Sequence, residues 1–126
     1  MPYLPAEIKV LLDEGAPILV SHPGALNYLL TKECLQWPSA WLEMRLARVI
    51  RHYMDQQPLS YHLINDVMGA LECCRREFER REGMVTRVDM ALRVAQDVIY
   101  ETIAVPYEIE AIKRNGDVYP SPERVA

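Results

Sequence analysis

The sequence has few of the residues on which small extracellular domains and many enzymes depend. It holds three cysteines, five glycines and one phenylalanine among 126 residues. The odd cysteine count, with Cys73 directly before Cys74, argues against a disulfide framework and favours reduced thiols. No Gly-x-Ser-x-Gly turn, glycine-rich phosphate loop, His-x-x-x-His or Cys-x-x-Cys occurs, which excludes the familiar motifs of serine hydrolases, nucleotide-binding loops and zinc sites.

Long apolar runs and an excess of positive charge are also missing. No apolar stretch reaches the ~18 residues that a membrane-spanning helix needs. The first ten residues lack the basic and apolar regions of a secretory signal. The net charge of −4 gives no global attraction to nucleic acid or to anionic membranes. The sequence therefore predicts a soluble, cytoplasmic protein without a membrane partner, and it argues against nucleic acid as a partner.

Apolar residues make up half of the chain, and they recur at helical spacing. No segment alternates well enough to predict a sheet, although residues 117–119 could add a short edge strand. The predicted helices cover about residues 5–14, 24–36, 39–57, 60–82, 86–103 and 106–114, and most are separated by proline or glycine. The prediction is a single all-α domain over residues 1–126, a small bundle of about five to six helices with an extended tail from about residue 117.

Several helix ends carry capping residues. Ser60 is placed to cap the helix over 60–82, and Thr86-Arg87-Val88-Asp89 resembles a capping box. Gly83 and Gly116 follow two of the helices, as expected of residues that readily take a positive φ.

The predicted helix over 86–103 is apolar on two sides. Val88, Leu92 and Ile99 form one stripe, and Val94 with Val98 adds a second. A helix at the surface of a small bundle needs only one apolar face. The sequence therefore predicts that this helix lies either at the centre of the bundle or between the copies of a homo-oligomer.

The densest charged stretch is Glu72–Glu82. Its acids and arginines twice stand four residues apart, a spacing that favours ion pairs along a helix: Glu72–Arg76 and Glu77–Arg81. One interpretation is a solvated face that pairs with itself. In the other, Arg75, Arg76 and Arg80 bind phosphate or carboxylate groups through their planar guanidinium groups.

Acidic residues raise the alternative of a metal-dependent nucleotide pyrophosphohydrolase. All-α enzymes of this class hold magnesium with one Glu-x-x-Glu and one Glu-x-x-Asp pair on neighbouring helices, since that spacing puts both carboxylates on one helix face. Glu79 and Glu82 have the first spacing, whereas Asp97 and Glu101 form an acidic pair in the reverse order. The chain therefore has one of the two acidic pairs that such an enzyme needs.

The remaining ionisable residues suggest no metal site. The three histidines have no acid or cysteine at a convincing spacing and are expected at the surface or at helix ends: His22, His52 and His62. We expect no cofactor, and we expect Cys73 and Cys74 to be core and near-core residues. The row Arg45, Arg48 and Arg51 leaves a helical DNA-binding regulator as a further alternative.

Two blocks combine polar residues that a helix does not need. Asn27 and Thr31 stand four residues apart on an otherwise apolar helix, next to Tyr28. The second block, residues 106–119, includes Tyr107 and Lys113 and offers Glu110–Arg114 as an i, i+4 pair. Each block is either ordinary helix packing or part of a ligand site.

The same blocks, taken in order, carry a likeness to other proteins: Met1-Pro2-Tyr3-Leu4-Pro5, Gly24-Ala25-Leu26-Asn27-Tyr28 with Thr31, Asn65 through Cys73, Glu77-Phe78 with Arg80-Arg81, and Pro106-Tyr107-Glu108 through Asn115-Gly116-Asp117-Val118-Tyr119. In these blocks the chain resembles a family of small uncharacterised proteins of bacteriophages and bacteria. The resemblance implies a phage or prophage origin and implies no activity.

The chain departs from that family in one respect. In the family a Glu-Phe-Tyr-Arg-Arg run leads almost directly into Pro-Tyr-Glu, whereas here residues 82–103 intervene as a whole helix. Alternatively, Val98-Ile99-Tyr100-Glu101 is the counterpart and the additional helix precedes it.

No complete catalytic constellation is present, so we expect a non-enzymatic binding protein that is a homo-oligomer. It would act on a host protein or sequester a small nucleotide-like ligand, in a counter-defence or regulatory role. Tyrosine rings can stack on bases, and Arg or Lys can meet phosphates. The predicted ligand-binding residues are Asn27, Tyr28, Thr31, Arg76, Arg80, Tyr107 and Lys113.

Overall fold

The computed structural model describes residues 23–37, 39–81 and 86–117. All regular structure in these residues is helical, which confirms the all-α prediction. Three expected features lie outside the described residues: the helix over 5–14, the tail beyond residue 117, and all of the edge strand except Asp117.

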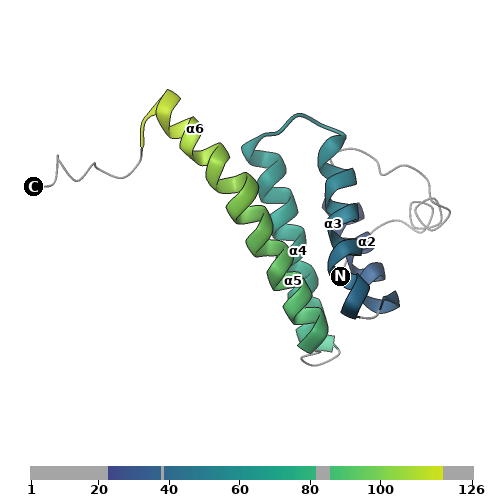
Figure 1. Cartoon of the computed structure of the whole chain (residues 1–126). Helices are drawn as coiled ribbons and strands as arrows, with labels where there is room; N and C mark the ends of the chain where they lie inside the picture. The colour runs from purple at the N-terminus through teal and green to yellow at the C-terminus, as the bar shows by residue number, and fades with distance from the viewer. Residues whose placement is uncertain (1–22, 38, 82–85, 118–126) are drawn as a thin grey trace, which may run out of the picture.

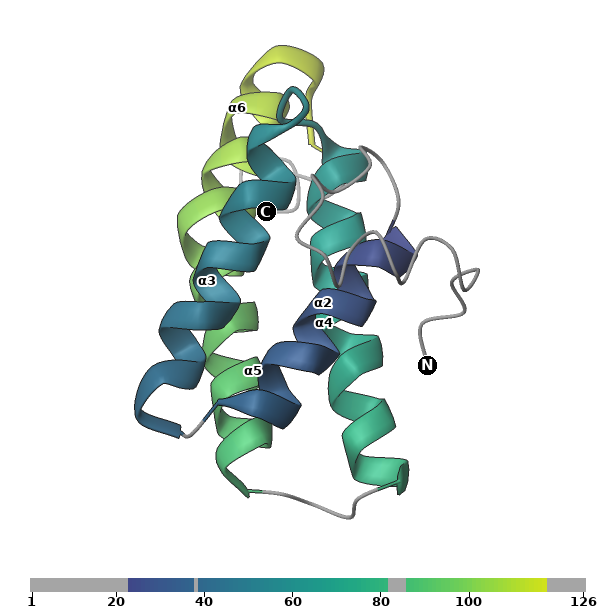
Figure 2. The same cartoon turned by 90° about the vertical axis from the view of Figure 1, so that its right-hand side faces the viewer.

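Four helices form a bundle, and each packs against two of the others (Figures 1 and 2). They are α2 (Pro23–Gln36), α3 (Ser39–Asp55), α4 (Tyr61–Arg81) and α5 (Thr86–Ile99). Helix α2 contacts α3 and α4, and α5 contacts the same two helices from the other side. The four helices therefore enclose one core, with α2 and α5 at opposite corners.

The core is built from apolar residues three or four positions apart on each helix. Fully buried members include Leu26 and Leu30 on α2, Leu42 and Leu46 on α3, Leu63, Val67 and Leu71 on α4, and Val88 and Leu92 on α5. Burying such a side chain contributes about 1.5–3 kcal/mol relative to leaving it exposed. The helical periodicity of the sequence is therefore sufficient to explain the core.

Two of the predicted helix ends are confirmed. The backbone N–H of Leu63 donates a hydrogen bond to Ser60 Oγ at 3.1 Å, so Ser60 caps α4. Gly116 has φ of 85° and its N–H donates to the carbonyl of Ile112 at 2.8 Å, which satisfies an otherwise open carbonyl at the helix end. Gly83 and the side chain of Thr86 lie outside the described residues.

Helix α5 does not stop before Pro106, although separate helices over 86–103 and 106–114 were predicted. It continues through a π-helical turn, η1 (Tyr100–Ala104), into α6 (Val105–Asn115). The N–H of Val105 bonds to the carbonyl of Tyr100, five residues earlier. Proline lacks an N–H and its ring collides with the carbonyl four residues back. The wider π turn gives the ring room, so one long rod replaces two helices (Figure 1).

The second apolar side of α5 faces away from the core. Val94 is 41% exposed and Val98 is 50% exposed, whereas Val88 and Leu92 are buried. A position at the centre of the bundle, one of the two predicted alternatives, is therefore wrong for this helix. Contact with another molecule, the second alternative, stays a prediction.

Within the described residues, no helix is both long enough and apolar enough to span a membrane.

Truncating a buried leucine should lower the free energy of unfolding much more than truncating an exposed one. Leu71 is fully buried, and Leu71→Ala should lower the free energy of unfolding by about 3 kcal/mol through lost burial and a residual cavity. Leu35 is 61% exposed, so Leu35→Ala, the matched control, should change it by less than about 0.5 kcal/mol. Urea denaturation followed by circular dichroism measures both, and equal losses would contradict the described core.

Candidate functional site

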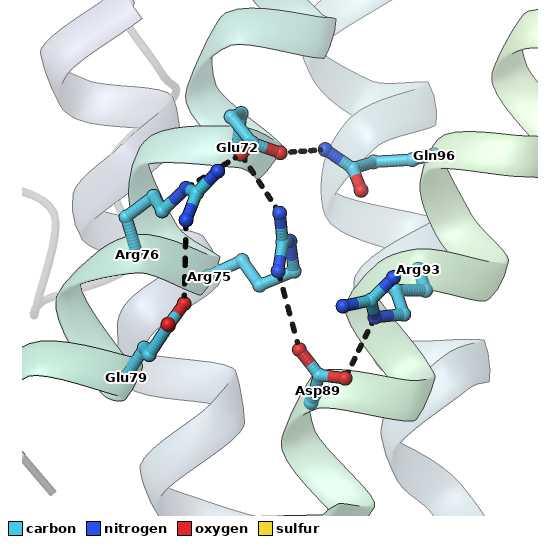
Figure 3. A network of polar contacts seen from close by, with 7 residues as sticks. All are labelled: Glu72, Arg75, Arg76, Glu79, Asp89, Arg93 and Gln96. Atoms are coloured by element: carbon cyan, nitrogen blue, oxygen red, sulfur yellow. Dashed lines mark hydrogen bonds and ion pairs between the residues drawn. The ribbon is translucent and has the colours of Figure 1, made fainter. Parts of the chain in front are cut away.

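The charged stretch of α4 pairs with itself and with α5 (Figure 3). Arg75 donates to Glu72 Oε1 at 2.8 Å and lies 3.5 Å from Asp89 Oδ1. Gln96 Nε2 donates to the other oxygen of Glu72 at 2.8 Å. This hydrogen bond, with those from Arg75 and Arg76, holds the pKa of Glu72 below its ordinary value. Asp89, which the sequence places in a capping box, binds Arg75 and Arg93.

The arginines predicted to bind phosphate are also in ion pairs. Arg76 Nε lies 2.9 Å from Glu72, and Arg80 Nη2 donates to Glu77 Oε2 at 3.0 Å. Arg81 lies 3.5 Å from Glu77, so both predicted i, i+4 pairs, Glu72–Arg76 and Glu77–Arg81, are present. These contacts support the interpretation of a face that pairs with itself, because the guanidinium donors already have acceptors.

The polar pair of α2 faces α4. The hydroxyl of Thr31 donates to the backbone carbonyl of Asn27 at 2.8 Å and lies 3.6 Å from Cys74 Sγ. Asn27 is buried, and Tyr28 packs against the core. Of the two readings of this block, the contacts favour helix packing over a ligand site.

The seven predicted ligand-binding residues do not meet in one chain. Glu72–Gln96 and Arg75–Asp89 contacts show that α4 and α5 run antiparallel. Arg80 therefore lies near the start of α5, while Tyr107 and Lys113 lie on α6, past its far end. A helix rises 1.5 Å per residue, so roughly 30 Å separates these levels. The single site expected from the sequence is not assembled, since the rod of residues 86–115 carries Tyr107 and Lys113 away from α4.

The acids of the hydrolase alternative are not gathered either. Among the described residues, no group of three His, Cys, Asp or Glu side chains could hold a metal ion. Glu79 lies near the end of α4 and pairs with Arg76 at 3.6 Å, whereas Asp97 and Glu101 lie farther along α5 and η1. Glu82 lies outside the described residues.

One arginine of the predicted DNA-binding row joins two helices. Arg45 donates to both carboxylate oxygens of Glu33, at 3.1 and 3.3 Å, and its guanidinium lies 4.4 Å from the ring centroid of Trp37. The bidentate pair and the cation–π contact connect α3 to the end of α2. The other two arginines of that row, Arg48 and Arg51, make no ion pair or hydrogen bond within the described residues.

Two thiols meet inside the bundle. Cys34 and Cys74 are buried and hydrogen-bonded to each other. This bond and burial raise the pKa of Cys34, and the same bond lowers the pKa of Cys74. Cys73 is exposed, so its predicted place in or near the core is wrong. The neighbouring position on a helix points about 100° away from the core.

A groove runs between α3 and α5, whose side chains line both of its parts. It has a wider part of about 740 Å³ and a narrower part of about 290 Å³. The two parts join at Ala47, Ile50, Val98 and Ile99, which line both. The wider part ends against η1, where Thr102 and Ile103 complete its wall.

Apolar side chains in and beside the groove are exposed. Met44 and Val98 are each 50% exposed, and Leu59 is also exposed at the wider end. Trp41 and Met90 add exposed apolar surface near the start of the same two helices. Sequence reasoning identified Val94 and Val98 but missed Met44 and Leu59, because nothing in a single helix pattern shows which helix will pack beside it.

The charges around this groove are unpaired in the described residues. Every aspartate, glutamate and arginine of α4 has a charged or histidine partner. By contrast, no ion pair or hydrogen bond within the described residues engages Glu43, Arg51 and Asp55, which line the groove, or Arg48, Asp97 and Glu101, which are exposed on the same α3 and on α5 with η1. At the groove, apolar surface and uncommitted charge therefore occur together.

The comparisons with known proteins give one match. A sequence family described as "Domain of unknown function (DUF6899)" matches residues 1–86. The match ends where α5 begins, so α5, η1 and α6 lie beyond it. Nothing among the curated proteins or the solved structures matches the chain.

The network at Glu72 should show itself in the pH dependence of stability. The folded-state pKa of Glu72 is lowered. The contribution of Glu72 to the free energy of unfolding is therefore present above its unfolded pKa of about 4.3, and it is lost as the pH falls through the folded-state pKa. Glu72→Gln should lower the free energy of unfolding at neutral pH by about 1 kcal/mol or less, because the carboxylate is partly exposed.

The difference between Glu72→Gln and the wild type should shrink as the pH falls below about 4. Urea denaturation at several pH values measures it, with Glu101→Gln as the matched control. A difference that stays the same at neutral and acid pH would contradict the described network.

Proposed function

Since the chain belongs to the family described as domain of unknown function DUF6899, whose description names no activity, we propose a function from the groove between α3 and α5. The protein is a non-enzymatic binding protein that takes an amphipathic helix of a partner protein into this groove. The observation that carries the proposal is the exposed apolar groove bordered by unpaired charges.

The shape and chemistry of the groove suit a helix. Amphipathic helices bind proteins by laying apolar residues at i, i+3, i+4 and i+7 into an apolar groove. The wider part, about 740 Å³, has room for several such side chains. Met44 and Met54 are among the residues that line the two parts, and methionine adapts its shape to different partners.

The resemblance to small phage and bacterial proteins suggests where the partner comes from. In this proposal the protein is phage-encoded, works in the host cytoplasm and binds a host protein, in a counter-defence or regulatory role. This step is an analogy with other small phage proteins and does not depend on the shape of the groove.

The other candidate functions have less support. Arg76 and Arg80, proposed to bind the phosphates of a nucleotide-like ligand, already bind Glu72 and Glu77. A DNA-binding row would need Arg45, which binds Glu33. A helix-binding groove requires no rearrangement of these contacts.

A charge placed in the groove should weaken partner binding. Val94 lines the groove and is partly exposed, so Val94→Asp should leave the fold intact and lower the affinity for a host partner at least about tenfold. Leu35 is exposed on α2 and lines neither part of the groove. Leu35→Asp is therefore the matched control and should bind as the wild type does.

The measurement has two steps. Host proteins retained by the immobilised wild type, and lost with Val94→Asp, are identified by mass spectrometry, and the partner is then purified and titrated by calorimetry. Binding of purified partner that is equal for the wild type and Val94→Asp would contradict the proposal.

A further inference from the structure

Beside the middle of the groove, the exposed charges on the two helices differ in sign. Arg48 and Arg51 project from α3, and Asp97 and Glu101 from α5 and its continuation. The joined parts of the groove place residues 47–51 of α3 level with residues 98 and 99 of α5. The two basic residues therefore lie across the groove from the two acidic ones.

These four side chains do not neutralise one another. All four are exposed, and none has an ion pair or hydrogen bond within the described residues. The apolar strip of the groove keeps them apart, whereas arginines and acids on α4 pair within 3.6 Å. An occupant that fills the strip would lie between a basic edge and an acidic edge.

We infer that the groove accepts a partner helix of defined polarity, with acidic residues on the flank facing α3 and basic residues on the flank facing α5. On such a helix the residues just before and just after an apolar anchor lie about 100° to either side of it. A helix with its anchors in the groove therefore brings one flank to Arg48 and Arg51 and the other to Asp97 and Glu101. This inference rests on the proposed function, because it names the chemistry of the helix that binds there.

The remaining charges of the groove lie at its two ends. Glu43 lines the narrow part and Asp55 the wide part, and both are on α3, one to two turns from the two arginines. They set the limits of the basic edge, so the recognised stretch spans about two turns of the partner helix. Complementary charges across an interface favour one partner over others more than they add affinity.

A displayed peptide library tests the flanks directly. The library holds helical peptides with fixed leucine anchors at i, i+4 and i+7, and with Glu or Lys varied at every flanking position. It is selected against the purified wild-type chain, and the enriched peptides are sequenced. We expect acid on one flank and base on the other to be enriched about tenfold over peptides with like charge on both flanks.

The matched variant is R48E together with R51E, which makes both edges of the groove acidic while leaving its apolar lining unchanged. With this variant, peptides basic on both flanks should become the enriched class. The control variant, R76E with R80E, changes two arginines on α4 away from the groove and should select the same peptides as the wild type.

Each outcome has a distinct meaning. Peptides that bind through their anchors but show no flank preference, or the same preference with R48E/R51E, would overturn this inference and leave the proposed function standing. If no peptide binds, or if the free protein sediments as a dimer that Val94→Asp dissociates, the groove does not receive a partner helix and both proposals fail.

Discussion

Helix α5 has two apolar faces, and a four-helix bundle can bury only one of them. Val88 and Leu92 fill the core between α3 and α4, which leaves Val94 and Val98 at the surface. Covering the second face would need another element over the seam between α3 and α5, and none of the described helices lies there. The groove follows from this surplus of apolar residues on one helix.

The distribution of ion pairs has the same origin. The charged residues of α4 stand at i, i+3 and i+4 spacing, so they pair with one another along the helix. Across to α5, Arg75 pairs with Asp89, and Gln96 donates a hydrogen bond to Glu72. Around the groove the apolar strip separates Arg48 and Arg51 from Asp97 and Glu101. Stability therefore comes from the closed seams of the bundle, whereas the recognition surface that we propose is the open one.

Much of this fold could be predicted from the sequence, because it depends on local patterns. Stripe spacing identified the helices, Ser60 and Gly116 marked two ends, and Glu72–Arg76 and Glu77–Arg81 formed as expected. The continuous rod through Pro106 could not be predicted in this way, since proline usually ends a helix and only the π turn accommodates it.

The candidate site was harder to predict because it depends on which helices are neighbours. Asn27, Arg80 and Tyr107 look alike in sequence as polar residues in need of a role, yet the fold places them on different seams and levels. Val94 and Val98 gave a correct signal of surplus apolar surface. Their groove partners on α3, including Met44 and Arg51, could be recognised only once α3 was known to pack beside α5.

Backbone amide hydrogen exchange of the protein with and without its natural partner tests the central claim most directly. If the open seam is the binding surface, exchange should slow on partner binding in α3, α5 and η1, and should stay unchanged in α2 and in the half of α4 that carries Arg76 and Arg80. Protection that instead appears on α2 and around Arg76 and Arg80, with α3 and α5 unaffected, would contradict it.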